Sequence, residues 1–147
     1  ESWCGETGCG QDELIGGRIH EEMLPFSYQV KSVAVHTAGA IEGLRAGVFS
    51  PDLNPPPADF AGLRAALGKA TTQLEALSEA ELEGFMDQPM RFEFRDYRMP
   101  FTAQDFLLSF SQPNFYFHAA TAYDILRMKG VPVGKRDFMG KLRLAAG

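Results

Sequence analysis

Two histidines are the residues whose type and spacing best suggest chemistry in this sequence. An α-helix over residues 102–130 would place four other residues on the face of His118, because successive side chains turn by about 100°. These residues are Asn114, Phe117, Thr121 and Ile125. His36 falls at the margin of the apolar stripe of an earlier helix, beside Gln29. We therefore expect both imidazoles to face the interior of a helical bundle.

Three interpretations of this pair stay open. The rings could be hydrogen-bonded core histidines, or His36 and His118 could bind a divalent metal such as zinc or nickel, completed by a carboxylate or water. His118 could also serve as a catalytic general base. A usable metal site needs a third protein ligand, and the position one turn after His118 is Ala122, which supplies none.

A pocket for a small molecule is the function that these residues favour most. We expect it to be lined by Gln29, Asn114, His118 and Tyr123. The alternatives are a non-catalytic module that dimerises through apolar faces and a metal-dependent transferase. The sequence leaves open whether the protein is an enzyme.

Other motifs carry less information. The sequence contains no Walker loop, no GxGxxG motif and no GxSxG motif. Cys4 and Cys9 lie in a glycine-rich stretch, and their spacing is not that of a zinc knuckle or a thioredoxin-like site. They are either two reduced thiols in a loose arm or a local disulfide or metal clip.

Composition excludes several classes of protein. The chain has 147 residues, which suits a single domain over 1–147 with a loose arm at 1–12 and a tail at 131–147. A net charge of −5 argues against general nucleic-acid binding. No apolar run is long enough to span a membrane, and no secretory signal is visible, so we expect a cytoplasmic protein.

The elements that would position the histidines are mostly helical. Apolar spacing predicts four helices, at 11–24, 26–46, 59–77 and 102–130. Gly39 and Gly43 would allow a neighbouring helix to pack closely on the second of these. Pro113 predicts a kink or break of the last helix near residues 109–112. Residues 89–101 alternate with a period of two and predict a β-hairpin.

These elements predict an all-α bundle with one small hairpin. The apolar face of the last helix is wider than two partner helices cover. A fourth helix or a second subunit would complete the bundle, so a homodimer is expected.

The C-terminal half also resembles a known family. Residues 113–127 read PNFYFHAATAYDILR, and residues 129–140 read KGVPVGKRDFMG. This signature resembles an uncharacterised family of bacteria and fungi within the DinB/YfiT-like superfamily, and the likeness covers about residues 15–140. Met23-Leu24-Pro25-Phe26, Gln29-Val30 and residues 102–108 fit the same family.

The resemblance implies an up-down four-helix bundle, often dimeric, with a helix before the region where this chain begins. That first helix is therefore expected to be missing here. Many superfamily members carry three histidines thought to bind a metal, one on the second helix and two on the last. His36 and His118 match the first two and Ala122 stands at the third, so the metal site is expected to be degenerate.

Overall fold

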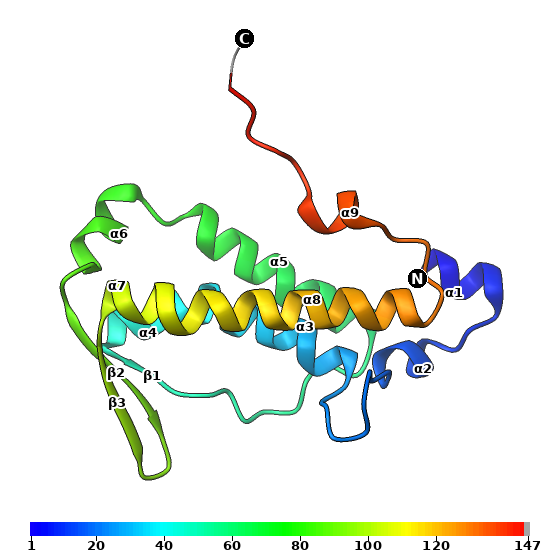
Figure 1. Cartoon of the computed structure of the whole chain (residues 1–147), viewed down its shortest axis with the longest axis horizontal. Helices are drawn as coiled ribbons and strands as arrows, with labels where there is room; N and C mark the ends of the chain where they lie inside the picture. The colour runs from blue at the N-terminus through cyan, green and yellow to red at the C-terminus, as the bar shows by residue number, and fades with distance from the viewer. Residues whose placement is uncertain (146–147) are drawn as a thin grey trace.

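A computed structural model describes residues 1–145 of the chain (Figure 1). The chain is mostly helical, with a small three-stranded sheet. Its elements in order are α1 (Ser2–Thr7), α2 (Gln11–Ile15), α3 (Phe26–Val35), α4 (Ala38–Ala46), β1 (Val48–Phe49), α5 (Phe60–Glu75), α6 (Glu79–Phe85), β2 (Pro89–Phe94), β3 (Tyr97–Thr102), α7 (Ala103–Asp105), the π-helix η1 (Phe106–Ser111), α8 (Gln112–Met128) and α9 (Lys135–Met139). None of the helices within 1–145 has the length and apolar character needed to cross a lipid bilayer.

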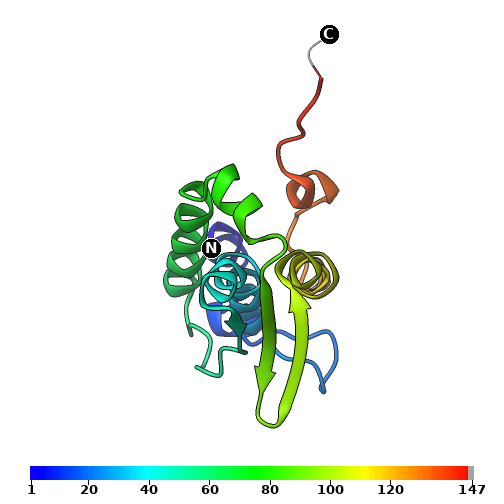
Figure 2. The same cartoon turned by 90° about the vertical axis from the view of Figure 1, so that its left-hand side faces the viewer.

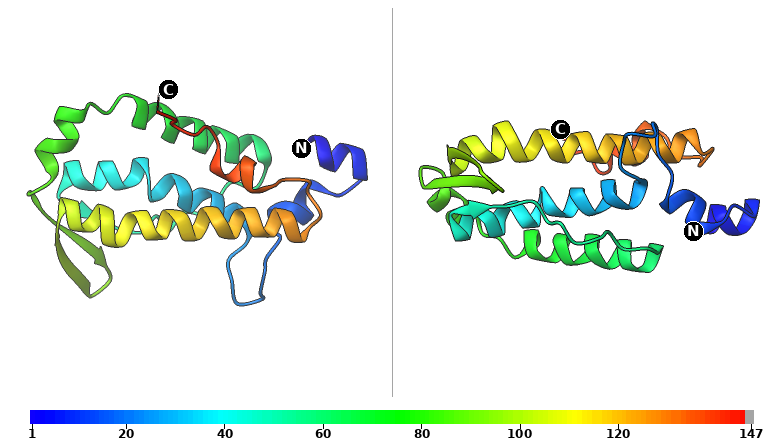
Figure 3. Two further views of the ribbon diagram at one scale, coloured as in Figure 1. Left: turned by 45° about the horizontal axis from the view of Figure 1, so that its top comes forward. Right: turned by 90° about the horizontal axis from the view of Figure 1, so that it is seen from below.

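Three rods of helix form the body of the molecule. The consecutive helices α3 and α4 lie between α8 on one side and α5 on the other, as the view from below shows (Figure 3). Buried side chains from α2, α3, α5 and α8 form one apolar cluster. A second cluster joins α4 and the sheet to α7 and the π-helix. The two histidines lie between these clusters, near the point where α3 ends.

The predicted helix over 26–46 is wrong as a single helix. It breaks at His36 and Thr37, and Thr37 adopts φ −119° and ψ −93°. The Thr37 hydroxyl donates to the carbonyl of Val33 at 2.7 Å, which ends α3 with a local side-chain bond. The close approach predicted at Gly43 is made by β1 instead of a helix, because a Cβ there would lie 3.0 Å from the Cβ of Phe49.

The N-terminal predictions also need correction. The helix expected at 11–24 ends at Ile15, because Gly16 and Gly17 follow and Gly17 lies against the core. A Cβ on Gly17 would lie 3.1 Å from the Ile125 side chain. The arm expected at 1–12 to be loose forms α1 and the start of α2. Within the tail at 131–147, α9 forms at Lys135–Met139.

The hairpin and the helix starts agree with the sequence patterns. Strands β2 and β3 pair antiparallel, with Phe94 opposite Tyr97. The pairing of β1 with β2 in parallel was not predicted, since β1 has only two residues. Asp59, Ser78 and Thr102 each accept a backbone N–H at the start of α5, α6 and α7.

The break predicted near 109–112 takes the form of a π-helix. Residues Phe106–Ser111 form a π-helical turn that joins α7 to α8 without interruption, and Pro113 occupies the first turn of α8. Proline is tolerated there because its missing N–H is not needed by that turn. The turn places Ser111 beside the end of α3, where its hydroxyl donates to the His36 carbonyl at 2.9 Å.

Candidate functional site

The structure brings His36 and His118 together in one cavity of about 210 Å³. We call it the histidine pocket. It lies between α3, the start of α8, the sheet and the loop that follows β1. Its walls are Tyr28, Lys31, Ser32, Val35, His36, Phe49, Pro51, Asp52, Phe92, Phe110, Asn114 and His118.

The orientation of His118 is set by Gln29. The Gln29 amide is buried, and its Nε2 donates to the carbonyl of Leu24 at 2.8 Å. Its Oε1 therefore faces Nδ1 of His118 at 2.7 Å and accepts from the Nδ1–H of the neutral ring. Because Nδ1 carries the proton, Nε2 holds a lone pair, and it has no hydrogen-bond partner among residues 1–145.

His36 stacks beside His118 in the pocket. The two ring centroids are 5.7 Å apart and the ring planes differ by 15°. Phe49 and Phe110 contact the other sides of His36, with centroids at 5.5 and 6.0 Å. Nδ1 of His36 is buried without a hydrogen-bond partner in the described chain.

Both imidazoles are neutral at pH 7. Burial lowers the pKa of His36 to about 4, with a further contribution from the charge of His118. Burial also lowers the pKa of His118. A protonated ring in either position would be poorly solvated and would repel its neighbour.

Asn114 borders the histidine pocket. Its Nδ2 donates to the carbonyl of Phe110 at 2.7 Å, which leaves its Oδ1 as an acceptor. Tyr123 lies elsewhere: its ring packs on Phe138 of α9, with centroids 5.7 Å apart. Phe117 was expected inside the bundle and is 55% exposed, so the inward face of α8 is narrower than the sequence suggested.

A buried lysine that sequence reasoning missed closes one side of the pocket. Nζ of Lys31 donates to the backbone carbonyls of Asp52 and Asn54 and forms an ion pair with the Asp52 carboxylate at 3.0 Å. Burial alone would raise the pKa of Asp52, but hydrogen bonds from Asn54 and Lys31 outweigh it and lower that pKa. No local pattern pairs residues 21 positions apart, so this contact could not be predicted from the sequence.

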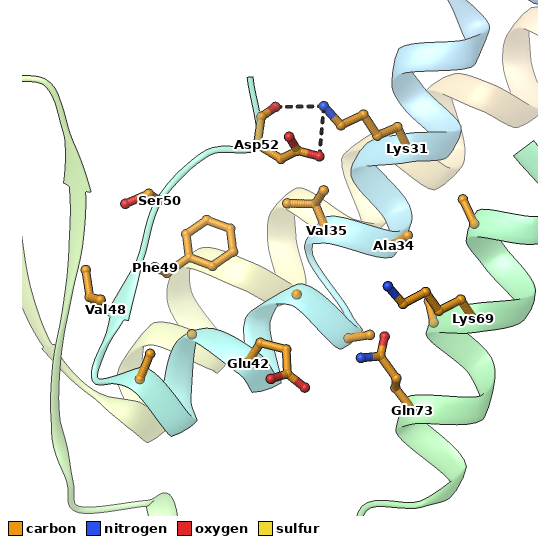
Figure 4. Close-up of a pocket in the computed structure, with 16 residues that line it drawn as sticks. Lys31, Ala34, Val35, Glu42, Val48, Phe49, Ser50, Asp52, Lys69 and Gln73 are labelled. Atoms are coloured by element: carbon orange, nitrogen blue, oxygen red, sulfur yellow. Dashed lines mark hydrogen bonds and ion pairs between the residues drawn. The ribbon is translucent and has the colours of Figure 1, made fainter. Parts of the chain in front are cut away.

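A larger cavity of about 520 Å³ lies on the other side of the contacts that Lys31 makes with Asp52 and Asn54, which we call the Lys31 clamp. Figure 4 shows Lys31 bonded to Asp52 at its edge, with Lys69 and Gln73 of α5 opposite Ala34 and Glu42. Small side chains of α3, α4 and α5 form much of its surface. The Lys31 clamp and Phe49 border both cavities.

The donor set does not fit a three-ligand metal centre. Across residues 1–145 no group of three or more His, Cys, Asp or Glu side chains is arranged to hold a metal ion. Asp52 is the carboxylate on the pocket wall, and Lys31 already occupies it. Ala122 belongs to the apolar cluster formed with Phe26 and Leu63 and does not border the pocket.

The geometry of the pocket allows two kinds of chemistry. Nε2 of His118 can accept a hydrogen bond from a ligand, and it can accept a proton as a general base. Much of the remaining wall is aromatic, and the one charged pair on it, Lys31 and Asp52, is internally neutralised. An uncharged ligand therefore matches the pocket better than an ion.

A family model covers most of the chain. It is described as a domain of unknown function, DUF1993, and it matches residues 1–139. The chain belongs to the DUF1993 family. This membership agrees with the resemblance read from residues 113–140, and it assigns no activity.

Comparison with solved structures supports the fold. This DUF1993 chain is similar to a DinB family member protein from Shewanella denitrificans, with 24% sequence identity and a TM-score of 0.81. The likeness covers 99% of this chain and 82% of the other. The fold is therefore DinB-like. No curated protein matches the sequence.

Proposed function

We propose that the histidine pocket binds a small uncharged molecule that donates a hydrogen bond to His118. The observation that carries this proposal is the bond between Gln29 and Nδ1 of His118, a residue of the pocket wall, because this bond fixes the tautomer and leaves Nε2 free to accept a hydrogen bond.

The size and lining of the pocket narrow the ligand class. Drug-sized molecules occupy cavities of roughly 300–1,000 Å³, whereas this cavity measures about 210 Å³. Among its polar atoms, Nε2 of His118 and Oδ1 of Asn114 are acceptors, and the hydroxyls of Tyr28 and Ser32 can both donate and accept. Aromatic rings of Phe49 and Phe110 stand beside them. A single aromatic or heteroaromatic ring with an N–H or O–H group satisfies both features.

Ligand-observed NMR with imidazole, phenol and benzamide as probes tests this proposal. We expect at least one probe to bind, and His118→Ala to abolish its saturation-transfer signal. Tyr123→Phe is the matched control, because that ring lies outside the pocket. Probes that bind wild type and His118→Ala equally, or that bind neither, would refute the proposal.

A metal-dependent transferase is the alternative with less support, because only two imidazoles converge and Asp52 is occupied. Adding zinc or nickel chloride to the apoprotein separates the two hypotheses. If the pocket is a metal site, titration should show stoichiometric binding that His36→Ala and His118→Ala both remove. We expect no such binding.

A second function, self-association, is favoured by an apolar trough between α5 and α8. Figure 2 shows the two helices apart, on either side of α3 and α4. The trough is lined at one end by Leu74, Leu77, Leu82, Leu108, Phe115 and Tyr116, and at the other by Leu67, Ala119, Tyr123 and Leu126. A contiguous apolar surface that is exposed to solvent in this way typically marks a protein–protein interface.

We propose that a second copy of the chain covers the α5–α8 trough. A helix laid there would bring the assembly to four packed helices, the arrangement that the sequence resemblance implies. The apolar lining and the absence of charged side chains along Leu74, Leu108 and Phe115 suit a helix face better than a polar partner.

A further inference from the structure

The two cysteines lie together at the end of α1. The helix closes at Gly8, which has φ +73° and donates its N–H to the carbonyl of Cys4 at 3.0 Å. A left-handed residue at this position turns the chain back over the last helical turn, which brings the residue after it toward the residue four positions before it. Here those two residues are Cys9 and Cys4.

The surroundings of the thiols agree with this placement. Both cysteines are free and partly buried. Sγ of Cys9 lies 3.6 Å from Oε2 of Glu13, whose other oxygen accepts from Nζ of Lys129 at 3.0 Å. Burial, the Glu13 carboxylate and the nearby Cys4 thiol raise the pKa of Cys9. Within residues 1–145 the two cysteines are not joined by a third side chain placed to hold a metal ion with them.

We propose that Cys4 and Cys9 form a reversible intramolecular disulfide when the protein meets a small-molecule disulfide such as oxidised glutathione. One cysteine thiolate attacks the glutathione disulfide, which releases one glutathione thiolate and leaves a mixed disulfide. The second cysteine then attacks the protein sulfur and releases the other glutathione. The two cysteines lose two electrons and two protons, and oxidised glutathione gains both.

The disulfide would fix the turn that joins α1 to α2. Helix α2 buries Leu14 and Ile15 in the core, and Trp3 of α1 lies against Gly130 after α8. Closing the loop between Cys4 and Cys9 would therefore hold the N-terminal helices in place against the rest of the molecule.

Mass spectrometry of the intact chain tests the proposal. The protein is incubated with excess oxidised glutathione at about pH 8.5. This pH is chosen because the raised pKa of Cys9 reduces the thiolate fraction at neutral pH. We expect a loss of about 2 Da and no titratable thiol, both reversed by dithiothreitol. Cys4→Ser and Cys9→Ser are the controls, since each keeps a single cysteine. Each should instead gain one glutathione, about 305 Da.

Any other product contradicts the proposal. Wild-type protein that retains one or two glutathione adducts would show that the thiols do not reach each other. Disulfide-linked dimers would show that they pair between molecules. A chain whose mass does not change would show that they are not accessible to the oxidant.

Discussion

The chemistry of the site depends on a hydrogen bond at His118 and on the burial of His36. Gln29 determines which nitrogen of His118 carries the proton, and burial keeps His36 uncharged. Neither property follows from residue type alone, because an exposed histidine would titrate near pH 6.5 in either tautomer. Substitutions that change only a hydrogen-bonding atom should therefore alter the protonation of the pocket histidines even where the shape of the pocket is kept.

Gln29→Glu should raise the pKa of His118. A carboxylate at this position would attract the charged imidazolium, and we expect the pKa to rise by about one unit or more. NMR titration of the ring protons measures the shift. Gln29→Met is the control, since it removes the bond without adding charge and should cost about 1–3 kcal/mol of stability. A pKa that is unchanged in Gln29→Glu would contradict the assigned hydrogen bond.

His36 should make the protein less stable in acid. Its pKa is near 6.5 in the unfolded chain and about 4 in the folded one. Between these values the unfolded state binds the extra proton, so the free energy of unfolding falls as the pH drops through this window. The decrease in Tm from pH 7 to pH 5 should be smaller in His36→Gln than in wild type.

His20→Gln is the matched control for this effect, because the His20 side chain is 59% exposed. It should show the same pH dependence as wild type. Equal pH dependence in His36→Gln and wild type would argue against a neutral, buried His36.

At the scale of elements, the site depends on places where regular structure stops. The break after α3 positions His36, and strand β1 and its loop bring Phe49 and Asp52 to the pocket. Lys31 holds that loop by three contacts. The loop between β1 and α5 is therefore an ordered wall of the pocket.

Lys31→Met should loosen this wall. The substitution leaves the Asp52 carboxylate and two backbone carbonyls without their donor, at a cost of about 1–3 kcal/mol. Limited proteolysis should then cut faster within residues 50–57. Lys69→Met, on the opposite rim of the larger cavity, is the control and should stay within about 0.5 kcal/mol of wild type. Equal cleavage of all three proteins would show that Lys31 does not anchor the loop.

The sequence predicted the helices and the hairpin better than the segments that connect them. The period-two alternation over residues 89–101 predicted the hairpin, and the helices expected from 59 and from 102 begin at Phe60 and Ala103, after the N-caps Asp59 and Thr102. The break at Thr37 was missed because the apolar stripe continues through it. Local spacing carries no information on a lysine that bonds a loop 21 residues away.

Of the residues expected at the candidate site, His36, Asn114 and His118 border one pocket, and Gln29 contacts it through its hydrogen bond to His118. Tyr123 does not border the pocket, because it lies five residues after His118, about 140° around the helix axis, where its ring packs on Phe138 of α9. The aromatic wall was also missed, since Phe49 belongs to a strand too short to show a pattern.

At the scale of the whole molecule, the α5–α8 trough is the feature that most needs a partner. Leu108 and Tyr116 are more than half exposed along it. Helices α5 and α8 lie on either side of α3 and α4 in the end-on view (Figure 2), and apolar side chains line the surface between them. Solvent contact with such a face is unfavourable, at roughly 25 cal/mol per Å² of apolar surface.

Light scattering coupled to size exclusion should therefore find a dimer, and Leu108→Glu should shift it to the monomer. A charge buried at an interface without a partner is strongly destabilising. Leu53→Glu is the control, because Leu53 is 77% exposed and lies away from the trough. A wild-type monomer, or a dimer that survives Leu108→Glu, would rule out this interface.

The π-helical turn at Phe106–Ser111 has one further consequence. Such a turn accommodates one residue more than an α-helical turn, so it rotates everything after it by about 100° around the helix axis. Asn114 and His118 come after it and owe their direction to that extra residue. If one residue of Phe106–Ser111 were deleted, this segment would form an ordinary α-helix and His118 would turn away from Gln29. The orientation of the His118 ring is thus set by the extra residue of a π-helical turn two turns before it.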